Sequence, residues 1–140
     1  MFRGGFTLLE LLFVLVLISV IAALALPGYR QQMARVHRTE AMTALLQLQS
    51  AEEKFYLRHN AYTSNLTATP PAGLGLSTTT SSNRYELSVA VADDGQTFIG
   101  TATPTPAGGQ DTDHECLAFS IDARGRRAVS GTRDVRYCWK

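Results

Sequence analysis

The sequence predicts an α+β fold in which one long N-terminal helix packs on an antiparallel sheet of about four strands. Three observations predict this class. A long apolar run near the N-terminus continues into a stretch with helical periodicity, and after Arg84 the apolar period changes to two. The two cysteines, Cys116 and Cys138, lie near the C-terminus and predict a disulfide loop there.

Composition limits the chain to one domain plus an appendage. Of its 140 residues, 45% are apolar and 18% are charged, which is typical of a folded protein. The formal net charge of +1 provides no overall attraction to nucleic acid or to a membrane surface. The long apolar runs lie within the first 26 residues, so the remainder must build a small core.

Residues 8–26 are long enough to cross a bilayer, because a helix of this length spans about 28 Å. A secretory signal peptide would have Arg3 as its charged region and Ala23-Leu24-Ala25 as its cleavage site. A plain membrane anchor is the second interpretation. Neither explains Glu10, because a carboxylate in a membrane span costs free energy unless it has a partner.

The residues before the apolar run favour a third interpretation. The stretch GGFTLLE at 4–10, followed by the apolar run, resembles the class III signal of type IV prepilins, the family of pilins and pseudopilins. The resemblance implies that a prepilin peptidase cuts after Gly5 and that the new terminal residue, Phe6, is N-methylated. Residues 1–5 would be the cleaved leader, and residues 6–27 would stay as membrane anchor and later as filament core.

On this interpretation Glu10 is a subunit assembly residue. Cleavage after Gly5 leaves a positive amine on Phe6, and a carboxylate in an apolar bundle would pair with the amine of a neighbouring subunit. Removal of one partner would leave the other charge alone in apolar surroundings.

Pro27 and Gly28 mark a helix hinge, because proline removes a backbone donor and glycine costs about 1 kcal/mol relative to alanine. Helical periodicity resumes after them, so we expect one kinked helix over 6–57 whose part at 28–58 is amphipathic. The resemblance implies that the helix melts at this proline on assembly. The expected apolar stripe comprises Met33, Val36, Ala41, Ala44 or Leu45, Leu48 and Phe55, and Arg30, Arg35, Arg38, Glu52 and Arg58 lie mostly off it.

Two further stretches narrow the resemblance. The helix end EEKFY at 52–56 and the following NAYTSNL at 60–66 are similar to minor pilins of the PilE type. We expect Asn60 or its neighbour to end the helix, and Tyr62 and Leu66 to return the connecting loop to the core.

Residues 59–140 form the predicted globular head. From Tyr85 to Val91, large apolar side chains alternate with polar or small ones, as in a half-buried strand. Asp93-Asp94-Gly95 is a hairpin turn signal. The remaining strands are expected at 97–103, 116–122 and 126–130, and Cys138 would hold the C-terminal end in place.

Cys116 and Cys138 have two interpretations. In an exported chain they form one disulfide, and in a cytosolic chain they would be two free buried thiols. The upstream membrane segment favours export, and such a bridge would stabilise the head by about 3 kcal/mol.

The sequence lacks signs of catalysis. His37, His59 and His114 are scattered, with no nucleophile or ligand spacing around them, so we expect neither an enzyme nor a cofactor. Asp111, Asp113 and Glu115 have a calcium-like spacing but lack the glycine and terminal acid of an EF-hand, so we expect no metal site.

Charge is unevenly distributed in the head. Residues 93–115 contain five acids and no Lys or Arg, whereas a basic stripe follows: Arg124, Arg126, Arg127, Arg133, Arg136 and Lys140. These charges could meet within one head, pair neighbouring heads, or bind DNA phosphates. Tyr137 and Trp139 lie beside the stripe and would offer faces on which bases stack.

Together these features predict a structural subunit of a type IV pilus, most similar to a minor pilin that helps to initiate or joins the filament. The alternatives are a major pilin that forms the filament bulk and a DNA-binding pilin. The resemblance implies other pilins, the prepilin peptidase and the inner-membrane assembly platform as partners, with membrane lipid around the apolar segment before assembly. The resemblance implies a bacterial inner-membrane location with a periplasmic head, then the extracellular pilus. Counting flanking charges, with Arg3 before the span and Arg30, Arg35 and Arg38 after it, predicts the opposite orientation.

Overall fold

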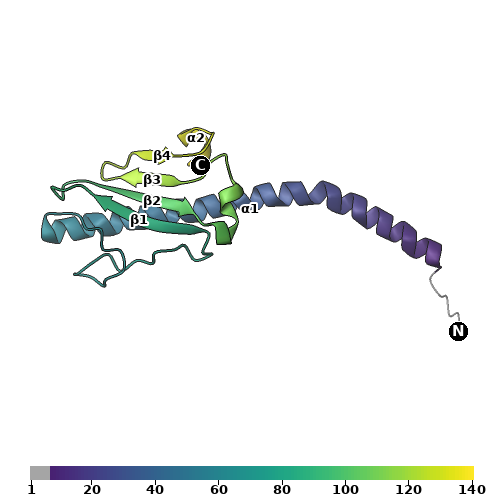
Figure 1. Ribbon diagram of the computed structural model, residues 1–140, viewed down its shortest axis with the longest axis horizontal. Coiled ribbons are helices and arrows are strands. Elements are labelled where there is room, and N and C mark those ends of the chain that lie inside the picture. Colours follow the sequence, from purple (N-terminus) through teal and green to yellow (C-terminus); the bar gives the residue numbers. More distant parts are fainter. Residues whose placement is uncertain (1–6) are drawn as a thin grey trace. The chain divides into compact units, whose positions relative to one another are not determined.

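The computed structural model describes residues 7–140, without the side chains of residues 26, 27, 30 and 31. The chain divides into two compact units, one up to Met33 and one from Ala34 to Lys140, and each is described by itself. The element order is one long helix, four strands with two short 3-10 turns between the second and third, and a short C-terminal helix (Figure 1).

Helix α1 runs from Leu8 to His59. At its start, the Glu10 backbone N–H donates to Thr7 Oγ1 at 3.3 Å, so a threonine satisfies a donor of the first turn. At its end, Asn60 adopts a φ of 56° and donates its N–H to the Tyr56 carbonyl at 2.8 Å. This left-handed residue closes the helix, which confirms the expectation for Asn60.

The four strands form one antiparallel sheet in the order β1-β2-β3-β4. Strand β1 (Tyr85–Val91) pairs with β2 (Phe98–Pro104) through a hairpin in which Val91 faces Phe98. Strand β3 (Phe119–Asp122) pairs with β2, and β4 (Arg127–Val129) pairs with β3 at the edge. Alternate side chains of β1, β2 and β3 are buried, and those faces meet the helix.

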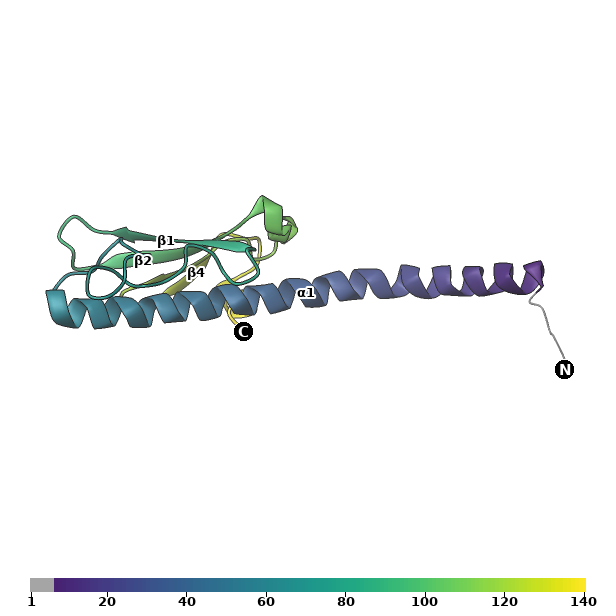
Figure 2. The same ribbon diagram turned by 90° about the horizontal axis from the view of Figure 1, so that it is seen from below.

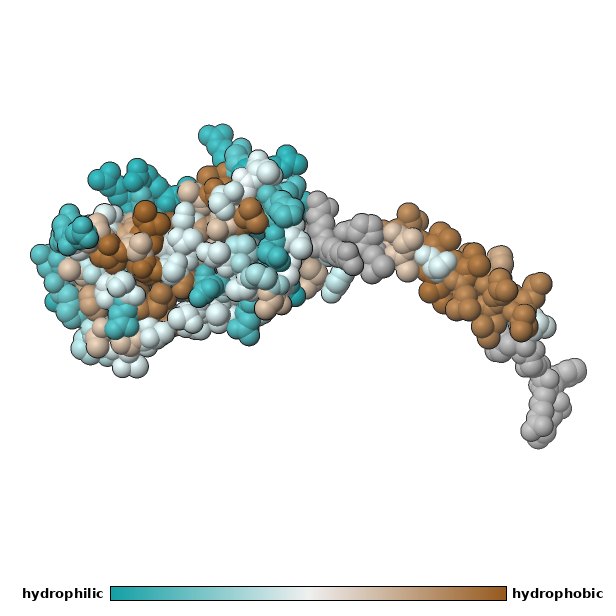
Figure 3. Space-filling model, viewed as in Figure 1, coloured by the Kyte–Doolittle hydropathy of each residue, from teal (hydrophilic) through white to brown (hydrophobic). Residues whose placement is uncertain are grey.

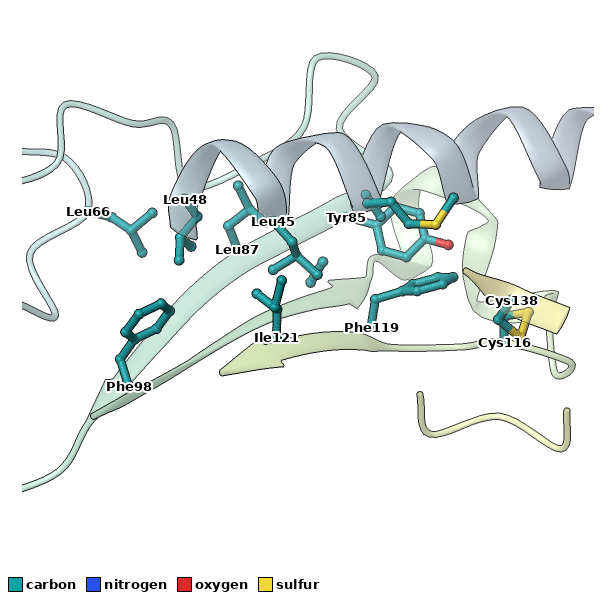
Figure 4. Packing of buried hydrophobic residues seen from close by; sticks show 13 residues of the cluster. Leu45, Leu48, Leu66, Tyr85, Leu87, Phe98, Cys116, Phe119, Ile121 and Cys138 are labelled. Atoms are coloured by element: carbon teal, nitrogen blue, oxygen red, sulfur yellow. A yellow bond between two sulfur atoms is a disulfide. The ribbon is translucent and has the colours of Figure 1, made fainter. Parts of the chain in front are cut away.

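The core of the second unit lies between α1 and one face of the sheet (Figure 2). Leu45 and Leu48 of α1 point toward Leu87, Phe98 and Ile121 of the strands (Figure 4). A Cβ at Gly100 would lie 2.8 Å from Leu48 Cδ2, so the missing side chain lets the helix approach β2 closely.

The buried stripe of α1 differs from the predicted one. Arg38, Ala41, Leu45, Leu48 and Glu52 are all buried and follow helical spacing, whereas Val36 is 51% exposed. The sequence prediction placed Arg38 and Glu52 mostly off the apolar stripe. The structure corrects this, since both side chains find polar partners in the segments that cover the helix.

The C-terminal third also departs from expectation. The N–H groups of Cys116 and Leu117 both donate to the Asp113 carbonyl, at 3.3 and 3.0 Å, and Leu117 has a φ of 44°. This is turn geometry, so β3 begins at Phe119 instead of Cys116. The segment between β2 and β3 contains 3-10 turns at Pro106–Gly108 and Gln110–Thr112, and the chain ends with helix α2 (Val135–Cys138), whose first turn Asp134 caps.

Candidate functional site

The apolar segment Leu8–Ala25 is the first candidate. It is long and apolar enough to cross a membrane, with a mean hydropathy of 2.9, and none of it is buried within the chain. Figure 3 shows an almost continuous apolar surface along this part of the helix. Apolar side chains exposed to this extent require a bilayer or other helices around them.

Glu10 is the one charged residue between Leu8 and Ala25. It lies in the first turn of α1, where a carboxylate faces the positive end of the helix dipole. Gly5 and Phe6 lie outside the described residues, so cleavage after Gly5 and methylation of Phe6 stay predictions. The pairing of Glu10 with an amine depends on them and stays a prediction as well.

The chain passes Pro27 and Gly28 without a break in α1. A Cβ at Gly28 would meet nothing within 4 Å, so packing inside the chain does not require a glycine there. Proline contributes no N–H to the helical ladder, and the following glycine has high conformational freedom. The two residues therefore weaken the helix locally, and the hinge stays a proposal.

Cys116 and Cys138 form the predicted disulfide. Their Cα atoms are 5.7 Å apart, and the two residues are 0% and 2% exposed. The bridge ties α2 to the segment before β3 and brings the C-terminal aromatic residues against the sheet, where the Trp139 ring packs edge-on against Phe119 at 5.8 Å.

A buried charge cluster centred on Arg38 was missed by sequence reasoning. Arg38 Nε and Nη2 donate to the two carboxylate oxygens of Asp113, both at 2.6 Å, and Nη2 also donates to Glu115 at 3.0 Å. These hydrogen bonds, led by that to Asp113, raise the pKa of Arg38, and the Arg38 contact is the largest cause that lowers the pKa of Glu115. The sequence does contain one sign of this cluster: Arg38 is spaced at helical intervals from the apolar residues of the buried helix face.

The acidic segment is therefore only partly available for other contacts. Asp113 and Glu115, the acids with calcium-like spacing, are charge partners of Arg38, and Glu115 also accepts from Arg133 at 3.4 Å. Asp93, Asp94 and Asp111 are exposed, and no cation pairs with them among the described side chains. Opposite charges thus meet inside one head at two of the five acids.

All six members of the basic stripe are exposed. Arg126 pairs with Asp122 at 2.6 Å and Arg133 pairs with Glu115. Within residues 7–140 the structure shows no ion pair for the other four, which are Arg124, Arg127, Arg136 and Lys140. The stripe lies on the turn before β4, on β4 itself and on the C-terminal segment (Figure 1).

Arginines cover the aromatic residues beside this stripe. The Arg127 guanidinium carbon lies 4.8 Å from the centroid of the Trp139 ring, and that of Arg133 lies 5.0 Å from Tyr137. Trp139 Nε1 donates to the Ala128 carbonyl at 3.3 Å, which holds the ring against β4. The expectation that these rings offer open faces to bases is revised, because each ring supports an arginine instead.

Two family models of known proteins match this chain. Residues 1–26 match a family model described as the prokaryotic N-terminal methylation motif. Residues 27–120 match a second model, described as the type IV minor pilin ComP, DNA uptake sequence receptor. The chain belongs to the type IV pilin family. Type IV pilins are structural proteins, and this chain shares with a solved member a long N-terminal helix and a globular head.

Individual pilins are similar over parts of their length. The major pilin PilE1 of Neisseria gonorrhoeae is 35% identical over 91 residues, which cover 65% of this chain and 41% of that one. The major pilin PilA of Myxococcus xanthus is 32% identical over 109 residues, or 75% of this chain and 46% of that one. A solved type IV pilin from Shewanella oneidensis has a TM-score of 0.52 at 25% identity and covers 76% of this chain and 98% of its own. This pilin thus spans less than half the length of these two curated relatives.

Proposed function

We propose that this pilin is a minor subunit that joins, and helps to initiate, a type IV pilus through packing of its N-terminal helix. The observation that carries the proposal is an unburied apolar segment, Leu8–Ala25, on a chain whose residues 27–120 match a minor pilin family. A segment of this kind has two suitable environments, the bilayer before assembly and the helix bundle of a filament afterwards.

The proposed maturation follows the residue ranges of the chain. The prepilin peptidase removes residues 1–5 and methylates Phe6, and residues 6–27 hold the subunit in the inner membrane with its head in the periplasm. The assembly platform then transfers the subunit into the pilus beside other pilins. Residues 28–58 support the head, which comprises residues 59–140. The hinge at Pro27 and Gly28 lets helix α1 bend during this transfer.

Quantification of sheared filaments tests the minor assignment. We expect this chain in the filament fraction at a small proportion of the total pilin. A filament fraction in which this chain dominates would make it a major pilin, as the names of the similar PilE1 and PilA proteins would favour. Absence from filaments, with the protein present in the membrane, would contradict both.

DNA binding is the second candidate function. It is supported by four exposed cations without carboxylate partners among the described side chains, Arg124, Arg127, Arg136 and Lys140, and by the DNA uptake receptor named in the matching family. Because Tyr137 and Trp139 are covered by arginines, the face presents cations instead of stacking surfaces. We therefore expect it to contact the phosphates of duplex DNA.

A gel shift with the full chain in detergent tests this candidate, using a duplex and a single strand of equal length. We expect the duplex to bind at low salt and affinity to fall steeply as salt rises. Arg136→Ala should reduce the salt slope by about 1, while Arg58→Ala, outside the stripe, should leave it unchanged. No duplex binding at low salt would end this candidate without affecting the assembly role.

A further inference from the structure

Glu52 is a fully buried carboxylic acid near the end of α1. Its side chain is 0% exposed, and Oε2 accepts the backbone N–H of Thr63 at 3.1 Å. The other oxygen, Oε1, is buried with no hydrogen-bond partner. No cation pairs with Glu52 among the described side chains. The group is thus placed where an ionised carboxylate is poorly solvated.

The segment that covers Glu52 is the clasp, residues 60–66, which returns the chain from α1 toward the sheet. Tyr62 holds it down: the backbone N–H donates to the Gly95 carbonyl at 2.9 Å, and the ring lies 4.6 Å from the Tyr56 ring and 4.8 Å from the Phe98 ring. The clasp therefore bridges the helix and the hairpin of β1 and β2, with the Glu52 carboxyl beneath it.

The charge that acts on Glu52 comes from an acid, Glu53. Glu53 adjoins it on α1 and accepts the Tyr62 hydroxyl at 3.1 Å, and Tyr62 is the titratable group that the clasp contributes. Burial raises the pKa of Glu52 to about 7. The hydrogen bond from Thr63 acts in the opposite direction, and the negative charge of Glu53 adds to the increase. With the clasp open, water would reach the carboxyl and return its pKa to about 4.3.

We propose that Glu52 makes the closure of the clasp depend on a proton, so that the clasp is held firmly when the carboxyl is neutral and loosens as it ionises. A carboxyl group whose pKa is raised in the closed state stabilises that state fully at pH values below its open-state pKa. That stability declines as pH rises toward 7 and then levels off. This opening and closing of the clasp takes place within the head and does not depend on the role of the pilin in a filament.

Hydrogen exchange of the full chain in detergent micelles, followed by mass spectrometry of peptides that cover residues 60–66, tests the proposal. After correction for intrinsic exchange rates, we expect the protection factor of the clasp to fall roughly fifty- to a hundredfold between pH 5 and pH 8. Peptides from β2 serve as an internal reference and should change little.

Two variants make the test specific. Glu52→Gln keeps the acceptor for Thr63 but cannot ionise, so protection of its clasp should be independent of pH. Glu53→Gln removes a neighbouring acid and should retain most of the pH dependence. Protection in the natural chain that stays constant between pH 5 and pH 8 would overturn the proposal without any variant. The same slope in Glu52→Gln and in the natural chain would overturn it equally.

Discussion

Two arginines of the head show how burial decides the value of an ion pair. Arg38 and Asp113 have side chains that are 7% and 5% exposed, and they meet in a bidentate pair. Arg126 also lies 2.6 Å from its partner, Asp122, but its side chain is 74% exposed. Water solvates the Arg126 side chain whether or not it pairs with Asp122. The buried charges of Arg38 and Asp113 have little contact with water, so each is stabilised mainly by the other.

Arg38→Met should therefore destabilise the head by about 3–5 kcal/mol, because Asp113 would stay buried without its cation. Arg126→Met, the matched control, should cost less than about 1 kcal/mol. Chemical denaturation of the full chain in detergent measures both. Equal losses in the two variants would contradict the role given to burial.

Glu10 supports a prediction about assembly. Glu10→Ala leaves Gly5 and Phe6 intact, so the leader should still be removed. Incorporation into filaments should fall strongly, because the amine of a neighbouring subunit would lose its partner in an apolar bundle. Immunoblots of sheared filaments against total membranes measure this, with Glu86→Ala on the exposed face of β1 as control. Normal incorporation of Glu10→Ala would disprove the pairing.

At the scale of elements, the disulfide fixes the position of the C-terminal segment and contributes less to the pairing of the sheet. It joins Cys116 to Cys138 across 22 positions and holds Trp139 and Tyr137, which support Arg127 and Arg133. The pairing of β1 with β2 lies outside this loop. Loss of the bridge should therefore release the basic stripe before it disturbs the hairpin.

The double variant Cys116→Ala and Cys138→Ala tests this order. We expect a loss of about 3 kcal/mol in the free energy of unfolding, as loop entropy returns to the unfolded chain. Hydrogen exchange should increase over residues 116–140 and stay near its original rate over β1 and β2. A uniform increase throughout the head would show that the bridge stabilises the whole fold instead.

Elements with local signals were predictable from the sequence, and those set by distant contacts were not. The alternation from Tyr85 to Val91 and the turn at Gly95 predicted β1 and the hairpin, because neighbouring residues carry that pattern. The burial of Arg38 depends on Asp113, 75 residues away, and that of Glu52 on the backbone of Thr63. Periodicity alone treats such charged residues as solvent-facing. The apolar segment and the basic stripe were found because composition marks them directly.

At the scale of the whole molecule, one chain combines two units whose surfaces suit different environments. One unit consists of an apolar helix with a single acid, and the other is a disulfide-closed head with a buried charge cluster. The assembly role proposed above explains why both occur together, since such a subunit needs a helix that suits lipid and filament and a head that suits water. A subunit with this role must keep its apolar segment after export.

The mass of the mature N-terminus tests that requirement most directly. Filaments or membranes that contain this pilin should yield an N-terminal peptide that begins at Phe6 and carries one added methyl group. A mature chain that begins at Leu26 would mean that the apolar segment is an ordinary signal peptide. Glu10 would then be absent from the mature protein, and the assembly role proposed for the helix would be contradicted.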